Sequence, residues 1–383
     1  MKKYLKKIAV LCVIMVFIMP LSGCWDYTEM NDFKYVAGIA VDKDINTDEY
    51  ILTLEVLEAS INSKSIKSEI VQSRGKTIHF AFRDAIKNTG KMLQLSHAKI
   101  IMVSKSIAME GIIPIVDMIN RDVETRNNMW ILVASTSKAS DIFSNKKDVD
   151  KIMSYDISDA IKNANKTGEY TPIEVFKLMQ RISNNGISAE TPMVGLVNKN
   201  GSTNFQVDGT AVFKGERMVG ELTPNETLIL QILKGKDPKF VIPVSLPNSG
   251  TVSFEIMNLK RKIRLKEEED KIVIDMYIEM NVSMSELAET QTNYLAKGKR
   301  KELTDQVEHC LKNRSNNLIE KLQYEYKSDL IGFGNEFKKR RPIRWQEVSK
   351  YWMGEYENSK INVSIDLNIK YSGLTNKNIK VGD

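Results

Sequence analysis

Apolar and polar residues alternate along three long stretches in the second half of the chain. Thr251–Leu265, Ile272–Met284 and Ile361–Tyr371 are predicted to be strands. An apolar residue at every second position puts one face of a strand against a core and the other in water. Glu302–Lys327 instead carries Leu and Val at helical spacing and predicts a long amphipathic helix. Long strands joined by such a helix indicate an antiparallel or mixed sheet covered by helices.

The first half alternates shorter apolar runs with amphipathic segments. Phe33–Val41 and Tyr50–Leu57 are predicted to pair as a hairpin. Glu58–Ser73 has weak apolar spacing and is predicted to be a loop or a frayed helix. Further along, we expect helices at Thr77–Asn88 and Ile112–Ile119 and strands at Ala98–Val103, Met129–Val133 and Met193–Val197. This alternation favours an α+β (mixed α/β) class, with several domains built from mixed and antiparallel sheets covered by helices.

Turn and cap signals divide the chain. Thr171–Glu174 and Thr223–Glu226 each have the pattern of a capping box with proline at the first helical position, so each predicts a helix start. Asn198–Ser202 predicts a linker or a tight turn, and a domain boundary is placed there. The predicted regions are a signal peptide over 1–23, an N-terminal region over 24–200 that can divide into two compact units, a C-terminal domain over 201–375 and a polar tail over 376–383.

The first 24 residues have the layout of a signal peptide. Four lysines precede the apolar run Ile8–Met19, which Pro20 ends. The run spans roughly 18 Å as a helix, whereas a bilayer core is about 30 Å thick. Leu21-Ser22-Gly23-Cys24 resembles a bacterial lipobox, which predicts Cys24 as an N-palmitoyl, S-diacylglycerol cysteine and the mature N-terminus. The alternatives are an uncleaved short anchor and a plain signal peptide followed by a chance cysteine.

Composition narrows the function classes. Hydrophobic residues make up 42% and charged residues 27% of the 383, which is ordinary for a globular protein. The net charge of +6 includes +4 from the leader lysines, so residues 24–383 carry +2. This near-neutral charge gives no reason to expect a nucleic-acid partner. Once Cys12 leaves with the leader and Cys24 is lipidated, Cys310 alone remains, so no intramolecular disulfide is expected.

Known catalytic and metal-binding motifs are absent from the sequence. His79, His97 and His309 are far apart, and no HExxH, CxxC, GxSxG, Walker A or GxGxxG pattern occurs. We therefore predict no catalytic residue, no metal and no cofactor. The basic run Lys338–Arg341 is interpreted first as cations near a helix C-terminus and second as a contact with anionic lipid headgroups. Trp345 and Trp352 are expected in a core, and Ile331–Gly334 as a turn between helices.

A series of short motifs runs in order along almost all of residues 24–383. They are Gly23–Asp26, Val36–Asp42, Gly75–Ile78, His97–Lys99, Asn120–Asp122, Phe213–Thr223, Ile331–Gly334 and Tyr371–Leu374. Each motif is short, but the ordered set resembles the Ger(x)C family, the C subunits of spore nutrient germinant receptors.

The resemblance implies a non-enzymatic lipoprotein on the outer face of the spore inner membrane. It would be needed for nutrient-triggered germination and would assemble with a multi-span A subunit and an integral-membrane B subunit. Cys24 is the one functional position that carries over, and binding of the germinant by this subunit is left open. Two other classes remain: a solute-binding lipoprotein, which predicts two similar lobes around a polar cleft, and a surface-tethered hydrolase, for which no nucleophile is visible.

Overall fold

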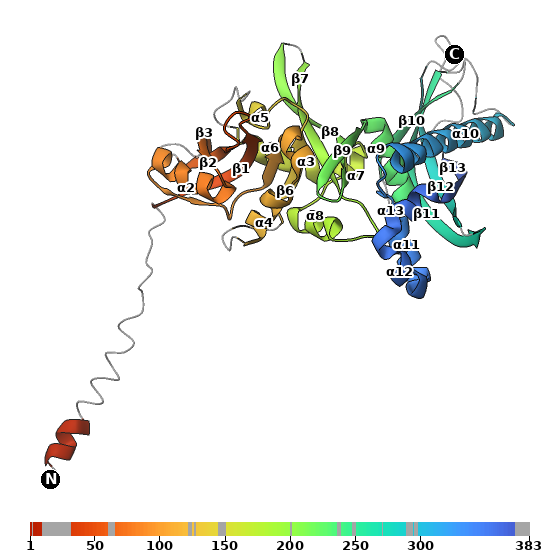
Figure 1. The fold of residues 1–383 in the computed structure, drawn as a ribbon. Coiled ribbons are helices and arrows are strands. Elements are labelled where there is room, and N and C mark those ends of the chain that lie inside the picture. Colours follow the sequence, from red (N-terminus) through yellow and green to blue (C-terminus); the bar gives the residue numbers. More distant parts are fainter. Residues whose placement is uncertain are drawn as a thin grey trace.

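The computed structural model describes residues 1, 3–9, 32–59, 66–121, 125, 128–144, 151–199, 201–235, 239–246, 250–269, 271–288, 294 and 298–371. Residues 3–9 form a short helix, and the described residues from 32 onward form a body with two sheets (Figure 1). The predicted lipidation site Cys24, residues 25–31 of the polar lead and the tail after residue 371 lie outside these ranges. Among the described residues, no helix is long and apolar enough to cross a membrane.

The first sheet is mixed. Its order is β3-β2-β1-β5-β6-β7-β8-β9, with the short β4 also paired to β1. The central strands β1, β5, β6 and β7 run parallel, and antiparallel pairs flank them on both sides. The strands are β1 Phe33–Lys43, β2 Tyr50–Ala59, β3 Ile66–Gly75, β4 Met92–Gln94, β5 Ile100–Val103, β6 Trp130–Ala134, β7 Glu190–Lys199, β8 Ser202–Lys214 and β9 Arg217–Leu222.

Helices cover both faces of this sheet. Strand β5 shows why, because all four of its residues are buried and they alternate between two cores. Ile101 and Val103 face one core, and Ile100 and Met102 face the other. The first core is closed by α2 Ile78–Thr89, α3 Lys105–Glu110, α4 Ile113–Arg121 and α8 Val175–Ile182, and the second by α5 Ser140–Ser144, α6 Met153–Lys162 and α7 Ala164–Thr167.

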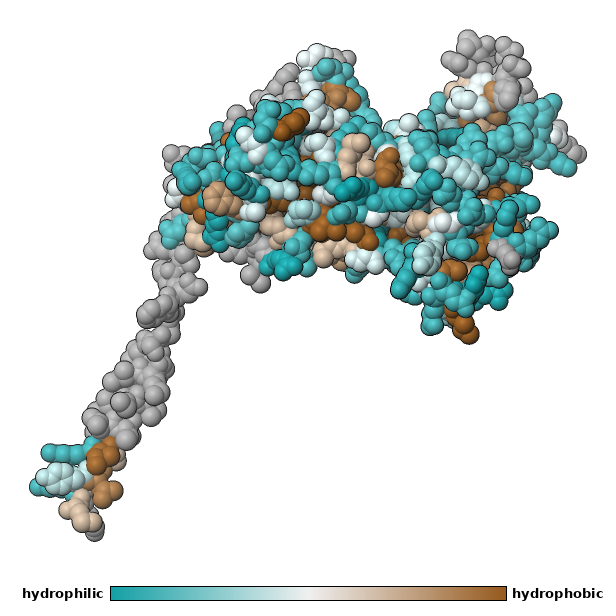
Figure 2. Space-filling view, viewed as in Figure 1, coloured by the Kyte–Doolittle hydropathy of each residue, from teal (hydrophilic) through white to brown (hydrophobic). Residues whose placement is uncertain are grey.

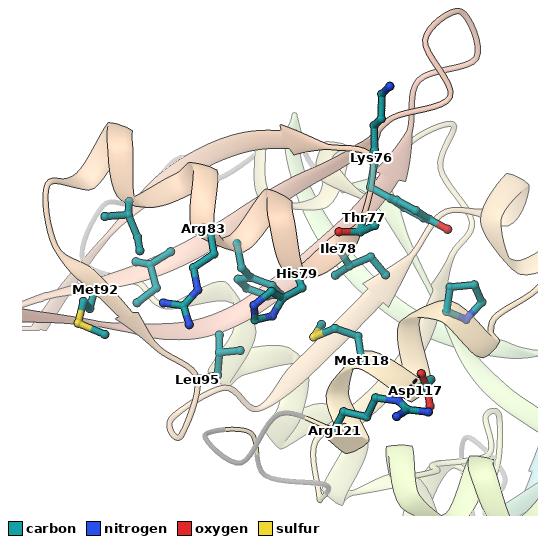
Figure 3. A pocket seen from close by; sticks show the side chains of 15 residues that line it. Lys76, Thr77, Ile78, His79, Arg83, Met92, Leu95, Asp117, Met118 and Arg121 are labelled. Carbon is teal, nitrogen blue, oxygen red and sulfur yellow. Dashed lines mark hydrogen bonds and ion pairs between the residues drawn. The ribbon is translucent and has the colours of Figure 1, made fainter.

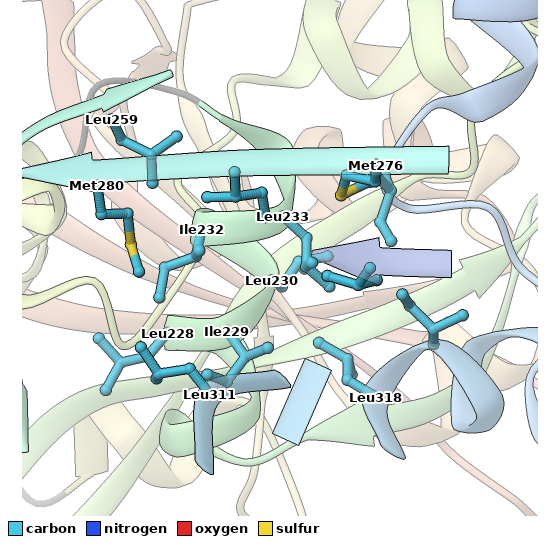
Figure 4. Close-up of a cluster of buried hydrophobic side chains, with 14 of the residues drawn as sticks. Leu228, Ile229, Leu230, Ile232, Leu233, Leu259, Met276, Met280, Leu311 and Leu318 are labelled. Atoms are coloured by element: carbon cyan, nitrogen blue, oxygen red, sulfur yellow. The ribbon is translucent and has the colours of Figure 1, made fainter. Parts of the chain in front are cut away.

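The second sheet has the order β10-β11-β12-β13 and one buried face. Its strands are β10 Val241–Leu246, β11 Gly250–Glu268, β12 Lys271–Ala288 and β13 Lys360–Tyr371. Apolar side chains from β11 and β12 pack against α9 Pro224–Lys234 and α10 Lys299–Glu320 (Figure 4). Strands β12 and β13 are parallel and therefore need a long crossover. It consists of α10, a π-helical turn Lys321–Glu325, α11 Phe333–Arg340, α12 Pro342–Val348, a 3-10 turn Ser349–Tyr351 and α13 Trp352–Asn358.

These elements confirm the predicted fold class and most of the predicted segments. The long alternating strands, the long helix and the second capping box are all present. Thr223 accepts a hydrogen bond from the Glu226 amide at 3.2 Å, Glu226 accepts one from the Thr223 amide at 2.8 Å, and Gly235 ends α9 at φ 65°. Trp345 and Trp352 are buried, as expected.

The prediction for Glu58–Ser73 was wrong where the chain is described. Residues 66–75 form β3, an edge strand paired antiparallel with β2. Ser68 and Ser73 are both buried but lie on opposite faces of the strand, and the Ser68 hydroxyl donates to Glu55 at 2.7 Å. Because small polar side chains occupy buried positions on both faces, the strand is hidden from a reading based on hydrophobicity alone.

The first capping box was also wrong. Helix α8 begins one residue after Glu174, which makes no side-chain cap hydrogen bond. Thr171 is buried instead, and its hydroxyl accepts a hydrogen bond from Gln231 of α9 at 3.0 Å. Thr171 therefore joins the loop before α8 to α9 and does not cap a helix. The local sequence cannot indicate this contact, because its partner lies 60 residues away.

Residues 198, 199, 201 and 202 belong to the hairpin of β7 and β8. Strands β7 and β8 pair up to Lys199 and Ser202, with Gly201 at φ 75°. Of the two interpretations of this stretch, the tight turn is confirmed. The predicted boundary near residue 200 thus falls between two paired strands of the first sheet, and the division into domains stays a prediction.

Buried carboxylates fasten helices to the first sheet. Asp42 of β1 accepts the amides of Ala139 and Ser140 at the start of α5, at 2.7 and 3.0 Å. Glu55 of β2 accepts the amide and hydroxyl of Ser154 at the start of α6, at 2.7 and 2.6 Å. The first amides of a helix have no partner within the helix and carry partial positive charge, so a buried carboxylate is stable there.

Glu190 of β7 is fully buried between two cations. Arg181 of α8 donates to it at 2.6 Å, and Lys234 at the end of α9 forms a second ion pair. Burial would raise the pKa of Glu190, but the positive charges of Lys234 and Arg181 outweigh it and lower the pKa to about 2. Because α9 also packs on the second sheet, this ion triad holds the shared helix against the first sheet.

We predict that Glu190→Gln lowers the free energy of unfolding by about 3 kcal/mol at pH 7, because two cations lose their buried counter-charge. The pKa of Glu190 in the folded protein lies below its ordinary value of 4.5, so the ionised carboxylate stabilises the fold above about pH 4.5 and this contribution is lost as the pH falls towards 2. Urea unfolding measured from pH 7 to pH 3 should therefore show that the difference in unfolding free energy between wild type and variant becomes smaller. Asp159→Asn, which breaks an exposed pair with Lys162, is the matched control and should cost under about 0.5 kcal/mol. A difference in unfolding free energy that stays constant over this pH range would contradict a stabilising role for the ionised Glu190.

Candidate functional site

A groove lies between α2 and α4 on one face of the first sheet, with a volume of about 730 Å³ (Figure 3). We call it the α2–α4 groove. Small-molecule pockets typically enclose about 300–1,000 Å³, so its size suits an organic ligand. Its apolar lining consists of Ile78, Phe82, Ile86, Met92, Leu93, Leu95, Pro114 and Met118, and its polar lining of Tyr50, Lys76, Thr77, His79, Arg83, Asp117 and Arg121.

Helix α2 presents two kinds of side chain to this groove. Thr77 caps the helix by accepting a hydrogen bond from the Phe80 amide at 3.2 Å, and Gly90 ends it at φ 64°. Ile78 and Phe82, four residues apart, are buried against the sheet. His79 and Arg83 follow each of them by one position, so they form an adjacent row along the groove edge, as Figure 3 shows.

The charged side chains of the groove differ in whether they have a partner. Arg121 is paired with Asp117 at 2.7 Å, and Lys76 points away from the cavity (Figure 3). Arg83 makes no ion pair or hydrogen bond with the described residues, and it lies beside His79 over an apolar floor that includes Leu95. A guanidinium binds carboxylate or phosphate through two parallel hydrogen bonds. The groove is thus chemically suited to a ligand with one anionic group and an apolar body.

The three histidines lie in different places. His79 lines the groove, His97 packs edge-on against Tyr35 with ring centroids 4.8 Å apart, and His309 is exposed on α10, 3.0 Å from Asn313. Within the described ranges, no three His, Cys, Asp or Glu side chains lie close enough together to hold a metal ion. Cys310 is a half-buried free thiol.

Sequence reasoning missed the groove. The sequence predicts α2 and α4 separately, but it does not show that the parallel β4 and β5 crossovers bring them onto the same face. The available signal was local: an aromatic polar side chain at position 79 and a cationic one at position 83, each next to a residue of the apolar face of α2.

Comparison with known proteins covers most of the chain. Residues 26–196 match the spore germination protein N-terminal domain, and residues 208–373 match the spore germination B3/GerAC-like C-terminal domain. Spore germination protein A3 of Bacillus subtilis (strain 168) is 25% identical, covering 97% of this chain and 100% of that protein. Spore germination protein B3 of the same strain is also 25% identical, covering 95% and 98%. Spore germination protein KC is 24% identical, covering 97% of each.

The fold has a counterpart among solved structures. The crystal structure of the GerBC protein aligns with a TM-score of 0.59 at 21% identity, covering 87% of this chain and 97% of that one. This likeness agrees with the mixed α/β class predicted from the sequence. Together, the two matched regions and the full-length relatives place the chain in the GerAC/GerBC/GerKC-like family of spore germination proteins, the C subunits of germinant receptors.

Proposed function

We propose that this protein is a lipid-anchored, non-catalytic subunit of a spore germinant receptor, needed for nutrient-triggered germination. Its mature N-terminus is the diacylglycerol-modified, N-acylated Cys24 on the outer face of the spore inner membrane. Its partners are the integral-membrane A and B subunits, which it contacts through its folded body. The observation that carries the proposal is a lipobox, Leu21–Cys24, directly ahead of the two germination-protein regions.

The physical logic is that of a tether. Two acyl chains contribute about 0.8 kcal/mol per buried CH₂, which together gives stable anchoring. Eight residues separate Cys24 from Phe33 at the start of β1, which makes nine steps along the chain, so the tether is at most about 30 Å long at roughly 3.3–3.6 Å per residue. A body held this close to a bilayer meets integral-membrane partners without a spanning segment of its own.

We predict that Cys24→Ala abolishes incorporation of labelled palmitate into the protein, because the acceptor thiol is gone. Cys310→Ala, the matched control, should keep the label, since Cys310 lies on α10 in the folded body. Spores carrying Cys24→Ala should fail to germinate with nutrients and still germinate with triggers that bypass receptors.

Wild-type protein purified from detergent-solubilised spore membranes should carry the A and B subunits with it. Unchanged palmitate labelling in Cys24→Ala would overturn the anchor, and purification without A and B subunits would overturn the assembly.

The α2–α4 groove favours a second candidate function, capture of a small solute. Solute capture is supported by Arg83, which lies beside the apolar lining of the groove and has no partner among the described residues. The second sheet differs from the first in size and connection, whereas a solute-binding lipoprotein is expected to have two similar lobes. We therefore rank solute capture below the subunit function and assign it to the α2–α4 groove alone.

The groove can be tested with anilinonaphthalene sulfonate, a fluorescent probe that joins an anionic group to an apolar body. We predict that Arg83→Gln weakens binding of this probe about tenfold, the cost of one lost charge-assisted hydrogen bond. Arg300→Gln, at an exposed position of α10, is the matched control and should leave the affinity unchanged. Equal affinities for wild type and Arg83→Gln would remove the groove as an anion site.

A further inference from the structure

Helices α11 and α12 form a projection at the lower side of the second sheet, away from β1 (Figure 1). We call this projection, residues 333–351, the α11–α12 tip. Seven consecutive residues, 338–344, are exposed, and they include five cations. These are Lys338, Lys339, Arg340, Arg341 and Arg344.

Positive charge is in excess here. Residues 336–351 contain six Lys or Arg and two Glu, although residues 24–383 as a whole carry only +2. Arg340 and Arg344 pair with Glu336 and Glu347, respectively. The other four cations, Lys338, Lys339, Arg341 and Lys350, have no ion-pair partner within the described ranges.

The tip also exposes apolar surface. Ile343 is 79% exposed and Tyr351 is 74% exposed, among the most exposed large side chains of the folded body. Figure 2 shows hydrophobic surface at the end of this projection, surrounded by hydrophilic surface. Ile343 lies within the exposed run 338–344, among its five cations. An exposed aliphatic side chain among cations favours the boundary between headgroups and acyl chains, where the charges meet anionic lipid.

The tip is held rigidly from within. Phe337, Trp345 and Trp352 pack together, with ring centroids 5.4–6.5 Å apart. Buried Asp329 accepts the amides of Gly332, Phe333 and Gly334 at the start of α11, at 2.8, 3.1 and 2.8 Å, and the indole N–H of Trp352 at 3.1 Å. The exposed cations therefore sit on a fixed support and do not need to be ordered on contact.

Helix-dipole stabilisation accounts for only part of this pattern. Lys338, Lys339 and Arg340 do occupy the last turn of α11, where cations are favourable. The dipole gives no reason for Arg344, which lies in the first turn of α12, where a cation is unfavourable, or for the exposure of Ile343.

We propose that the α11–α12 tip is a second membrane contact, which docks onto the anionic phospholipid headgroups of the bilayer that holds the lipid anchor. This inference rests on the proposed anchor at Cys24. The anchor joins the body at β1 in the first sheet, while the tip extends from the second sheet. Two contacts at separate places on the body determine its orientation relative to the membrane, and therefore which of its surfaces face the A and B subunits.

The test uses the full chain on vesicles, with an environment-sensitive fluorophore at Gln346→Cys in a Cys310→Ser background. Gln346 is exposed on α12, one turn from Ile343, so the label reports the tip while all cations remain. We expect brighter, blue-shifted emission on vesicles that contain phosphatidylglycerol than on pure phosphatidylcholine. Each lysine near an anionic surface is worth about fivefold, so Lys338→Gln with Lys339→Gln should lower the docked-to-undocked ratio about 25-fold.

The matched control is Lys260→Gln with Lys262→Gln, the same charge change on two exposed lysines of the outer face of β11, and it should leave emission unchanged. Flotation of the same samples tests the anchor separately. If the chain floats with the vesicles and its emission ignores phosphatidylglycerol, the tip proposal is wrong and the anchor stands. If the chain does not float, the anchor fails. Cys12→Ser and Cys24→Ser are then added before labelling, and titration of that chain with phosphatidylglycerol vesicles decides the tip: an emission shift that the Lys338 and Lys339 changes weaken supports it, and no shift overturns it.

Discussion

The body depends on one helix that is buried on almost all sides. In α9, Leu228, Ile229, Leu230, Ile232 and Leu233 are buried, and Thr227 and Lys234 on the remaining side are buried as well. Such a helix is stable only if it is covered completely. Strands β8 and β9 cover it from the first sheet, through Val212 and Leu222, and β11, β12 and α10 cover it from the second. The two sheets are thus joined through a shared core that neither could close alone.

Polar contacts fix the position of this shared helix. Lys234 at its end pairs with Glu190, and Gln231 reaches Thr171 in the loop before α8. Hydrophobic burial is non-directional, so it would allow the helix to slide or turn between two apolar faces. A buried ion triad and a side-chain hydrogen bond are satisfied in one register alone, because a displaced charge would lose its partner at a cost of several kcal/mol. We infer that apolar burial supplies the stability and these contacts supply the geometry.

The sequence predicted elements well where one rule acts locally. Period two in Ile272–Met284 and the reciprocal cap at Thr223 each depend on neighbours within a few residues, and both are present as expected. It failed where the deciding partner is distant. Ser68 on β3 is buried because Glu55 accepts its hydroxyl, and Thr171 is buried because Gln231 reaches it across 60 residues. The groove could not be predicted for the same reason, because the order of the strands in the sheet decides that α2 and α4 lie on the same face. The four buried carboxylates likewise look like surface residues in the sequence, because burial is set by packing and not by residue type.

The rigidity of the α11–α12 tip matters for how strongly it must bind. A tether of at most about 30 Å keeps the tip at an effective concentration in the millimolar range next to the bilayer. A contact with a dissociation constant near 1 mM, worth about 4 kcal/mol, is then occupied about half of the time. A few cations and one aliphatic side chain can supply this, provided that none of the gain is spent on ordering the segment. Asp329 and the Phe337–Trp345–Trp352 cluster meet that condition, because they fix the tip before any contact forms. A contact that is occupied about half of the time already biases the body towards one orientation on the membrane, which is what the second contact is proposed to do.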